Sequence, residues 1–460
     1  MKKLFSVILI LSVITISFSQ QNEDDINALS IFNEYSKAKN YEAAYGPWIE
    51  LRNRNPKFHL GIYSEGEKIL KYKIKNSAGE EKIAFIRDLI FLYSQRREFF
   101  KTKTPLGKFL AKSAKIQYDF RKELNISTLE LFNSYDNAFK SDLKSFNNPI
   151  DLLTYFKLAV ELFDDGVKTA EELFTKYDEV SEKVESEVEN YTVKLNAFLP
   201  SDDSSMEVTY SKKDAQKIRA YNSYLKGYEQ ISKGMDISLG IRANCENLVI
   251  LYQKNYEENK NDGLWLQRAM NRLAGKDCID TELFVTILQQ KNNLDPNPDT
   301  SYYLGIIKDR EGKTDEALEY YNQAIDLQTD GYKKAKILFK IATNFKKSGS
   351  FSKARSYYKK ALRFNPSMGK CYIAIAQMYA SSAKNCGSDN FSQRAVYWLA
   401  SSEALKASKV DPNLKIAANN SSKNYLAKAP QKSEIFSSGR EGELISIGCW
   451  IGSSVKVPNL

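Results

Sequence analysis

Few side chains in this sequence could carry out chemistry, and the single histidine, His59, is the first to consider. A Ser–His catalytic arrangement, a histidine metal cage and histidine acid–base catalysis would all depend on it. His59 lies between Phe58 and Leu60, in a stretch that we expect to connect two helices. A surface or packing role is the simpler interpretation, so the histidine gives no support to catalysis.

The candidate metal and phosphate motifs are also weak. The "DDG" of 164–166 lacks the spacing of oxygen ligands in a calcium loop, and "GREGE" (439–443) lacks the glycine pattern of a phosphate cradle. No two cysteines have the two-residue spacing of a zinc site. The many carboxylates of 161–190 fit a charged helix face. We therefore expect no catalytic residue, no metal site, no cofactor and no enzymatic activity.

The first twenty residues have the pattern of a secretory signal. Two lysines precede the apolar run 4–18, and Ser17 and Ser19 are small residues at its exit. The run is short for the ~20 residues that a membrane span needs, and the first cysteine, Cys245, is too distant for a lipoprotein anchor. The pattern predicts cleavage near Ser19 or Gln20. We therefore expect an exported protein, periplasmic or associated with the outer membrane, with no transmembrane segment after cleavage.

An exported chain with five cysteines can form two disulfides and keep one thiol. We expect helices over 243–256 and 262–275. If they run antiparallel, Cys245 and Cys278 lie side by side, within the roughly 4.4–6.8 Å between Cα atoms that a disulfide needs. The sequence therefore predicts a Cys245–Cys278 bond.

The second expected disulfide joins Cys386 to Cys449, because both lie in loop or terminal segments that can move to meet each other. This bond would attach the end of the chain to the last helices and leave Cys371 as a free thiol within a helix. A Cys371–Cys386 bond is the competing pairing.

The net charge of +10 raises the question of nucleic acid as a ligand. The charge is unevenly placed, since 161–190 alone carries eleven acidic residues against three lysines. The excess of lysine and arginine is scattered over many helices. Solvated helix faces explain it, so we expect no nucleic-acid partner.

A repeated spacing of small and aromatic residues defines the elements. The stretches "GKTDEALEYYNQA" and "GSFSKARSYYKKA" place a glycine, an alanine, a tyrosine and a second alanine at the same offsets: Gly312, Ala317, Tyr321 and Ala324, then Gly349, Ala354, Tyr358 and Ala361. Two antiparallel helices can approach closely only where side chains are small. We therefore expect Gly305 to face Ala317 and Ala342 to face Ala354. The same intervals recur up to Pro412 and, near the start, in 31–56.

This spacing resembles the tetratricopeptide repeat, a helix–turn–helix unit of about 34 residues. The match is clearest over 298–412 and weaker over 25–56. The unit 298–331 departs from the pattern, with Lys308 and Thr329 where an aromatic residue and proline are usual. The resemblance implies an all-α, TPR-like α-solenoid of antiparallel helix pairs. With "YEAAYGPWIEL", "KNC" and "GCWI", the chain is also similar to uncharacterised exported repeat proteins of gram-negative bacterial envelopes.

Two further elements depart from the repeat. An apolar stripe from Leu173 to Leu195 predicts one long helix over 168–195, a polar break over 199–211 follows it, and a basic helix is expected over 212–233. An acidic and a basic helix around a polar turn suggest a long antiparallel hairpin with complementary charges. We expect limited proteolysis to cut 199–211 first.

The end of the chain, "GELISIGCWIGSSVKVPNL", predicts two short strands around Gly452 and Ser453. The expected pattern places four side chains on one side of this hairpin: Ile445, Ile447, Cys449 and Ile451. A lone hairpin is marginal in water, so it should dock on the last helices as a lid.

These elements divide the chain into five expected parts. They are a signal peptide (1–20), N-terminal TPR-like repeats (21–125), an irregular helical region with the long hairpin (126–240), a C-terminal TPR array (241–428) and a tail with the β-hairpin (429–460). The sequence sets no oligomeric state.

The leading functional hypothesis is an exported scaffold or adaptor that binds a protein or peptide partner in the cell envelope. We expect an extended, partly apolar segment to bind the groove of 298–412, at Tyr302, Ile306, Phe339, Thr343, Ile373 and Gln377. In the chaperone-binding subtype of the family these places hold lysines and asparagines that clamp a C-terminal carboxylate. Here they are mostly apolar, so the resemblance implies that this clamp is absent.

Three alternatives remain at this point. The C-terminal tail could itself cover the groove. The chain could instead bind a small envelope ligand such as a glycan through aromatic residues near the start, namely Tyr35, Tyr41, Tyr45 and Trp48, although Tyr35 and Trp48 occupy core positions of the repeat. An undetected hydrolase is the third alternative.

Overall fold

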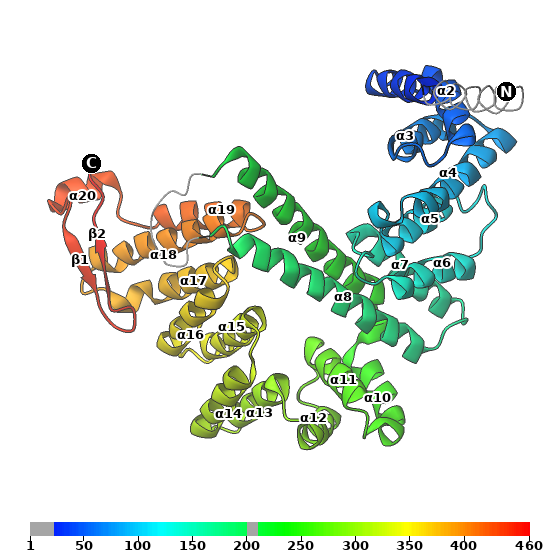
Figure 1. Ribbon diagram of the computed structural model, residues 1–460. Coiled ribbons are helices and arrows are strands. Elements are labelled where there is room, and N and C mark those ends of the chain that lie inside the picture. The colour runs from blue at the N-terminus through cyan, green and yellow to red at the C-terminus, as the bar shows by residue number, and fades with distance from the viewer. Residues whose placement is uncertain (1–22, 200–209) are drawn as a thin grey trace, which may run out of the picture. The chain divides into compact units, whose positions relative to one another are not determined.

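The structure, a computed structural model, describes residues 23–199 and 210–460 and is helical along most of them (Figure 1). The chain divides into two compact units at the boundary between Lys183 and Val184. The expected signal segment 1–20 and most of the polar break 199–211, where proteolysis was expected, lie outside the described residues. The five expected parts of the chain stay a prediction.

The described part of the first unit is a run of helices that contact their neighbours in sequence. A helix over 23–37 is followed by α2 (Tyr41–Arg54), α3 (Gly61–Asn76), α4 (Gly79–Phe99), a 3-10 turn (Lys101–Lys103), α5 (Leu106–Asp119), α6 (Thr128–Ser141), α7 (Pro149–Asp164) and the first half of α8 (Ala170–Asn196). Ser127 and Glu130 cap α6 reciprocally with side chain and backbone.

The aromatic residue of the first repeat is a core residue. Trp48 of α2 is fully buried, and its indole N–H donates to the carbonyl of Ile62 at 2.7 Å. Gly66 of α3 lies against the same ring, where an added Cβ would come within 2.6 Å of it. The helices α2 and α3 therefore pack closely because a glycine faces a tryptophan.

A buried carboxyl in this unit makes its stability depend on pH. Asp151 of α7 is 5% exposed, and its Oδ1 accepts no hydrogen bond from the described residues. Burial raises the pKa of Asp151 to about 7, with opposing contributions from Lys115 and Lys112 and a reinforcing one from Asp119. The unfolded chain loses this proton near pH 4, so the unit loses stability as pH rises from about 4 to about 7.

We expect Asp151→Asn to remove this dependence, because the amide stays neutral. At about pH 8 the variant should be more stable than the wild type by roughly 1–3 kcal/mol, and at about pH 4 the two should be equal within error. Hydrogen exchange of α7 in the full chain, measured at both pH values, checks this. Equal protection in the two proteins at the higher pH would contradict it.

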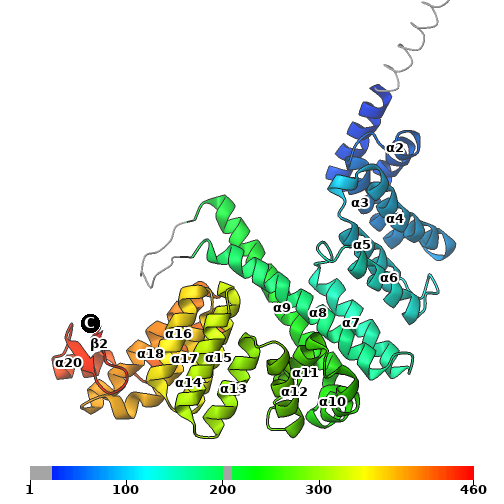
Figure 2. The same ribbon diagram turned by 60° about the horizontal axis from the view of Figure 1, so that its bottom comes forward.

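The second unit contains the repeat array. After α8 come α9 (Lys212–Leu239), a 3-10 turn (Gly240–Ala243), α10 (Cys245–Asn259), α11 (Gly263–Gly275), α12 (Glu282–Leu294), α13 (Pro298–Arg310), α14 (Thr314–Leu327), α15 (Gly331–Lys347), α16 (Phe351–Phe364), α17 (Gly369–Cys386), α18 (Asn390–Val410), α19 (Lys415–Leu426), α20 (Lys432–Ser438), β1 (Leu444–Ile447) and β2 (Ser453–Lys456). Figure 2 shows α13 to α18 stacked side by side. The predicted all-α solenoid with a small β-hairpin is confirmed.

The repeat spacing places small residues where the helices of this array cross and turn, as expected. The pairs α13–α14, α15–α16 and α17–α18 pack most extensively. Gly312 and Gly349 have φ of 77° and 78°, the left-handed conformation that lets one helix end and its partner begin. Ala342 and Ala354 are fully buried. Small residues therefore lie at both the helix crossings and the turns.

The hairpin of α8 and α9 is joined by aromatic residues. Tyr191 of α8 stacks on Tyr224 of α9 with 4.6 Å between ring centroids, and α9 continues to Leu239, beyond the expected end at 233. The carboxylates of Glu185 and Glu189 pair with lysines of α15. These two carboxylates of α8 therefore meet the repeat array, and the predicted pairing of complementary charges between α8 and α9 stays a prediction.

The C-terminal hairpin turns earlier than predicted. The strands pair antiparallel, with Ile445 opposite Val455, and end before a turn over 448–452. Cys449 therefore lies in the turn, exposed and with φ of 47°, whereas Ile445, Ile447 and Ile451 are buried, so the prediction that all four side chains lie on one side of the hairpin is wrong for Cys449. A turn is favoured there because Gly448 and Gly452 flank the segment.

The hairpin docks on the array, as expected of a lid. The Trp450 ring lies 5.4 Å from the Phe351 ring of α16 and 5.5 Å from the Tyr379 ring of α17. Arg355 donates to the carbonyl of Ile451 at 2.6 Å. The lid therefore covers the part of the array formed by α16, α17 and α18.

Candidate partner-binding groove

A pocket of about 770 Å³ opens beside the first helices of two successive repeats. Helix α13 supplies Asp299, Tyr302, Tyr303, Ile306 and Arg310, and α15 supplies Lys333, Lys336, Ile337, Lys340, Thr343, Asn344 and Lys347. The end of α11 and the connection to α12 form another wall, and Glu185 of α8 lies at its edge. We call this pocket the α13–α15 groove.

The structure brings three of the six predicted groove residues together. Tyr302, Ile306 and Thr343 line the α13–α15 groove. Phe339 instead packs on Tyr358, with 5.5 Å between ring centroids. Of the two on α17, Ile373 is half-buried, while the Gln377 amide oxygen accepts from Lys346 at 2.5 Å.

The aromatic floor of the groove is mostly buried. Tyr302 is only 7% exposed and Ile306 only 9%. The Tyr302 ring lies edge-on to Tyr303 at 5.0 Å and 6.1 Å from Tyr321. Burial raises the pKa of both Tyr302 and Tyr303 above the usual range, so these phenols stay neutral. Neighbouring tyrosines cover much of the Tyr302 ring, so the floor presents only a small aromatic surface.

A row of lysines forms the wall of the groove, and sequence reasoning missed it. Lys333, Lys336, Lys340 and Lys347 are spaced three, four and seven residues apart on α15, which places them on one face of the helix. Their spacing in "GYKKAKILFKIATNFKK" was a signal that could have found them. The groove is therefore polar and cationic above an aromatic floor.

The lysines have different partners. Lys336 pairs with Glu185, and Lys333 lies 4.0 Å from Glu189. The Lys340 ammonium lies 5.3 Å from the centre of the Tyr302 ring. Partial burial and the positive charge of the neighbouring Lys340 lower the pKa of Lys336 to about 8. The site therefore holds two lysines one helical turn apart whose charges repel each other.

Hydrogen bonds fix the middle of α15 at the groove. The amide of Asn344 donates to Asp309 at 2.7 Å and to the hydroxyl of Tyr321 at 2.9 Å. Thr343 donates its hydroxyl to the carbonyl of Phe339 at 2.9 Å. The Thr343 bond lies within α15, and the two Asn344 bonds join α15 to the preceding repeat, so the lysine row has a defined position against α13.

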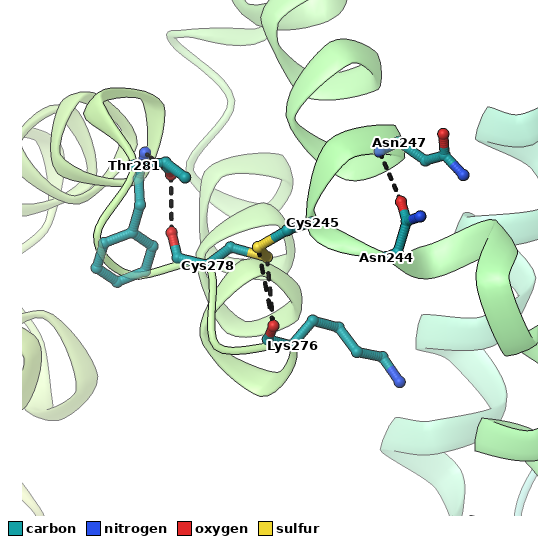
Figure 3. Close-up of a disulfide and its surroundings, with 7 residues drawn as sticks. Asn244, Cys245, Asn247, Lys276, Cys278 and Thr281 are labelled. Carbon is teal, nitrogen blue, oxygen red and sulfur yellow. Dashed lines mark hydrogen bonds between the residues drawn. A yellow bond between two sulfur atoms is a disulfide. The ribbon is translucent and has the colours of Figure 1, made fainter.

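A disulfide holds the remaining wall. Cys245 at the start of α10 bonds to Cys278 after α11, with 5.5 Å between Cα atoms (Figure 3). The groove residues Asp277 and Ile279 flank Cys278 in the chain. Figure 3 also shows the hydrogen bond from Thr281 to the Cys278 carbonyl, 2.7 Å long, at the start of α12. The predicted bond is present and pins this connection.

The second predicted disulfide is also present. Cys386 at the end of α17 bonds to Cys449 in the turn of the lid, with 5.3 Å between Cα atoms. Cys371 is free and buried, and burial raises the pKa of its thiol well above the usual range. The competing Cys371–Cys386 bond is therefore not formed. The lid contacts named above lie on α16 and α17, away from the residues that line the α13–α15 groove.

The aromatic residues proposed for a glycan are mostly packed in the first unit. Trp48 is fully buried, while Tyr41 and Tyr45 pack partly buried against the core cluster around it. Tyr35 is 41% exposed. Within the described residues, therefore, no open aromatic surface joins these four side chains.

Two features of the described residues bear on other classes of protein. None of their helices has both the length and the apolar character needed to cross a membrane. In the same part of the chain, no three histidine, cysteine or acidic side chains cluster closely enough to hold a metal ion.

The model of the tetratricopeptide repeat matches residues 299–367, the two repeats that form the groove. Among curated proteins, Photosystem I assembly protein Ycf3 of Cyanophora paradoxa is 32% identical over 107 residues, covering 21% of this chain and 62% of that protein. The protein of the same name from Synechococcus elongatus is 30% identical over 129 residues, covering 26% of this chain and 71% of its own length. The chain thus spans less than two thirds of the first of these relatives.

Solved structures of repeat proteins show more distant likenesses. A tetratricopeptide repeat protein from Parabacteroides merdae matches 68% of this chain and 97% of its own, with 9% identity and a TM-score of 0.24. Yeast Tom70 matches 92% of this chain and all of its own, with 12% identity and a TM-score of 0.26. Tetratricopeptide repeat proteins are generally non-enzymatic scaffolds that bind protein partners. The repeat match and the relatives in sequence show that the chain belongs to the tetratricopeptide repeat family.

Proposed function

We propose that this protein is an exported scaffold that binds a segment of a partner protein in the α13–α15 groove. The observation that carries the proposal is the groove itself, about 770 Å³ in volume and lined mainly by the first helices of the two repeats that match the family. Its wall of lysines above an aromatic floor offers both charged and apolar contacts. A pocket of this composition suits an extended peptide better than a buried small molecule.

The proposed location is the bacterial cell envelope, in the periplasm or at the outer membrane. The secretory pattern of the first twenty residues supports export. The two disulfides also support it, because such bonds persist in oxidising compartments. An assembly role fits the relatives that are named as assembly proteins. Cell fractionation with N-terminal sequencing of the mature protein, expected to begin near Gln20 or Gln21, tests the location.

A photo-crosslinking residue in place of Lys347 tests the binding function. Lys347 lies exposed at the groove, so the substitution should leave the fold intact. In native cells we expect crosslinks from this position to one partner or a small set of partners, identified by mass spectrometry. The matched control is the same residue in place of Lys359, which is exposed on α16 and does not line the groove. Identical crosslinks from both positions would exclude the groove as the binding site.

A further inference from the structure

The groove carries more positive than negative charge, and its acidic side chains come largely from outside the two repeats of α13 to α16. Arg310 and the four lysines named above face it. Arg310 pairs with Asp280. The carboxylates that reach Lys336 and Lys333 belong to α8, a helix about 150 residues earlier in the chain. The array itself therefore leaves its central lysines to be neutralised by another segment.

The neutralising contacts are of a kind that a ligand can replace. In the Lys336–Glu185 pair the two side chains are 37% and 51% exposed, and in the Lys333–Glu189 pair 53% and 26%. Ion pairs as exposed as these contribute little to stability. Lys340, one helical turn after Lys336, makes no ion pair with the described residues. Its ammonium instead lies over the rings of Tyr302 and Tyr303. A competing carboxylate would therefore gain contacts with both lysines.

We infer that Glu185 occupies, in the free protein, the place of a partner's acidic side chain, and that the partner binds by displacing it from Lys336. This inference rests on the proposed function and names its ligand. The ligand is a protein segment with a glutamate or aspartate beside an aromatic or branched aliphatic residue. The carboxylate lies between Lys336 and Lys340, and the apolar side chain lies on the floor at Tyr303 and Ile306. The remaining acidic face of α8 then acts as a weak internal competitor that sets the affinity.

Random-sequence peptides displayed on phage and selected on the full-length protein test the ligand. We expect the enriched peptides to share an acidic residue next to an apolar one. Selection on the variant Lys336→Gln with Lys340→Gln should lose the acidic preference. The control variant Lys359→Gln with Lys409→Gln removes the same amount of positive charge from exposed positions of α16 and α18. Peptides selected on this control should keep the acidic preference.

The most enriched peptide is then measured in solution against each protein. The groove double variant should bind it roughly ten-fold more weakly. Glu185→Gln should bind it roughly two- to five-fold more tightly, because the competitor is gone. Added salt should weaken binding to the wild type more than to the groove double variant. Circular dichroism confirms that each variant is folded.

Several outcomes would overturn the inference. The enriched peptides could lack an acidic preference and still crosslink to a photo-crosslinking residue at position 347. That result would leave the proposed function intact and reject the acidic ligand. An unchanged affinity in Glu185→Gln would reject the competition by α8. A labelled single-stranded oligonucleotide that binds the wild type and not the groove double variant would identify a nucleic-acid site and reject the protein ligand.

Discussion

Replacing Gly305 with leucine is expected to destabilise the repeat array by roughly 2–4 kcal/mol, because the position has no room for a side chain. An added Cβ would lie 2.6 Å from the Tyr321 ring and 3.2 Å from the carbonyl oxygen of Ala317. Tyr321 is fully buried and its ring is 6.0 Å from that of Phe345 in the next repeat, so it has little freedom to move away. The helices α13 and α14 would have to separate.

Hydrogen exchange of α13 and α14 in the full-length chain measures this effect locally, and thermal unfolding followed by circular dichroism measures it globally. The matched control is Gly275→Leu, at the last residue of α11, where an added Cβ meets nothing within 4 Å. That change should alter stability by less than about 0.5 kcal/mol. If the two variants show the same protection of α13, the close crossing at Gly305 does not hold the pair together.

This crossing also shows why so much of the fold follows from the sequence. The contact of Gly305 with α14 and the left-handed Gly312 both depend on residues within one helix–turn–helix unit. The same is true of the capping box at Ser127 and of the disulfide that joins Cys245 to Cys278 across a helix pair. Local geometry of this kind repeats along the chain, so a spacing rule is enough to find it.

The groove was harder to predict because it depends on the rotation of α15 against its neighbours. The sequence reasoning assigned Phe339 and Thr343 to the open face, but the structure presents the face that carries Lys336, Lys340 and Thr343, and Phe339 turns toward Tyr358. The predicted open face and the observed open face of α15 are offset from each other by about one residue position around the helix axis. The spacing of lysines was visible in the sequence, but nothing local indicated which face would meet the pocket.

The rotation of α15 changes the chemical interpretation of the groove. The positions equivalent to a carboxylate clamp are mostly apolar, as the resemblance implied, yet lysines reach the same pocket from adjacent positions. Glu185 approaches Lys336 from a helix far away in the sequence, and no periodic pattern could have indicated this pairing. Long-range contacts between unlike elements therefore set the charge of the site, and they are what sequence patterns describe least well.

Breaking the Cys386–Cys449 disulfide is expected to release the C-terminal lid. The bond closes a loop with a sequence separation of 63 residues, and a native bond over a loop of this size contributes roughly 2–4 kcal/mol. A two-stranded hairpin is marginal on its own. The remaining contacts of the lid, such as Trp450 with Ser382 at 2.9 Å and Arg355 with the carbonyl of Ile451, would have to hold it alone.

Hydrogen exchange of 444–457 should therefore rise strongly in the variant Cys386→Ser with Cys449→Ser, while the exchange of α13 and α15 stays unchanged because the lid does not line their groove. Reductant should produce the same rise in the wild type and none in the variant. The matched control is Cys245→Ser with Cys278→Ser, which should loosen the α11–α12 connection and leave the lid protected. A lid that stays protected in the first variant would mean that the Trp450 and Arg355 contacts suffice to hold it. The disulfide would then stabilise the unit only by restricting the conformations of the unfolded chain.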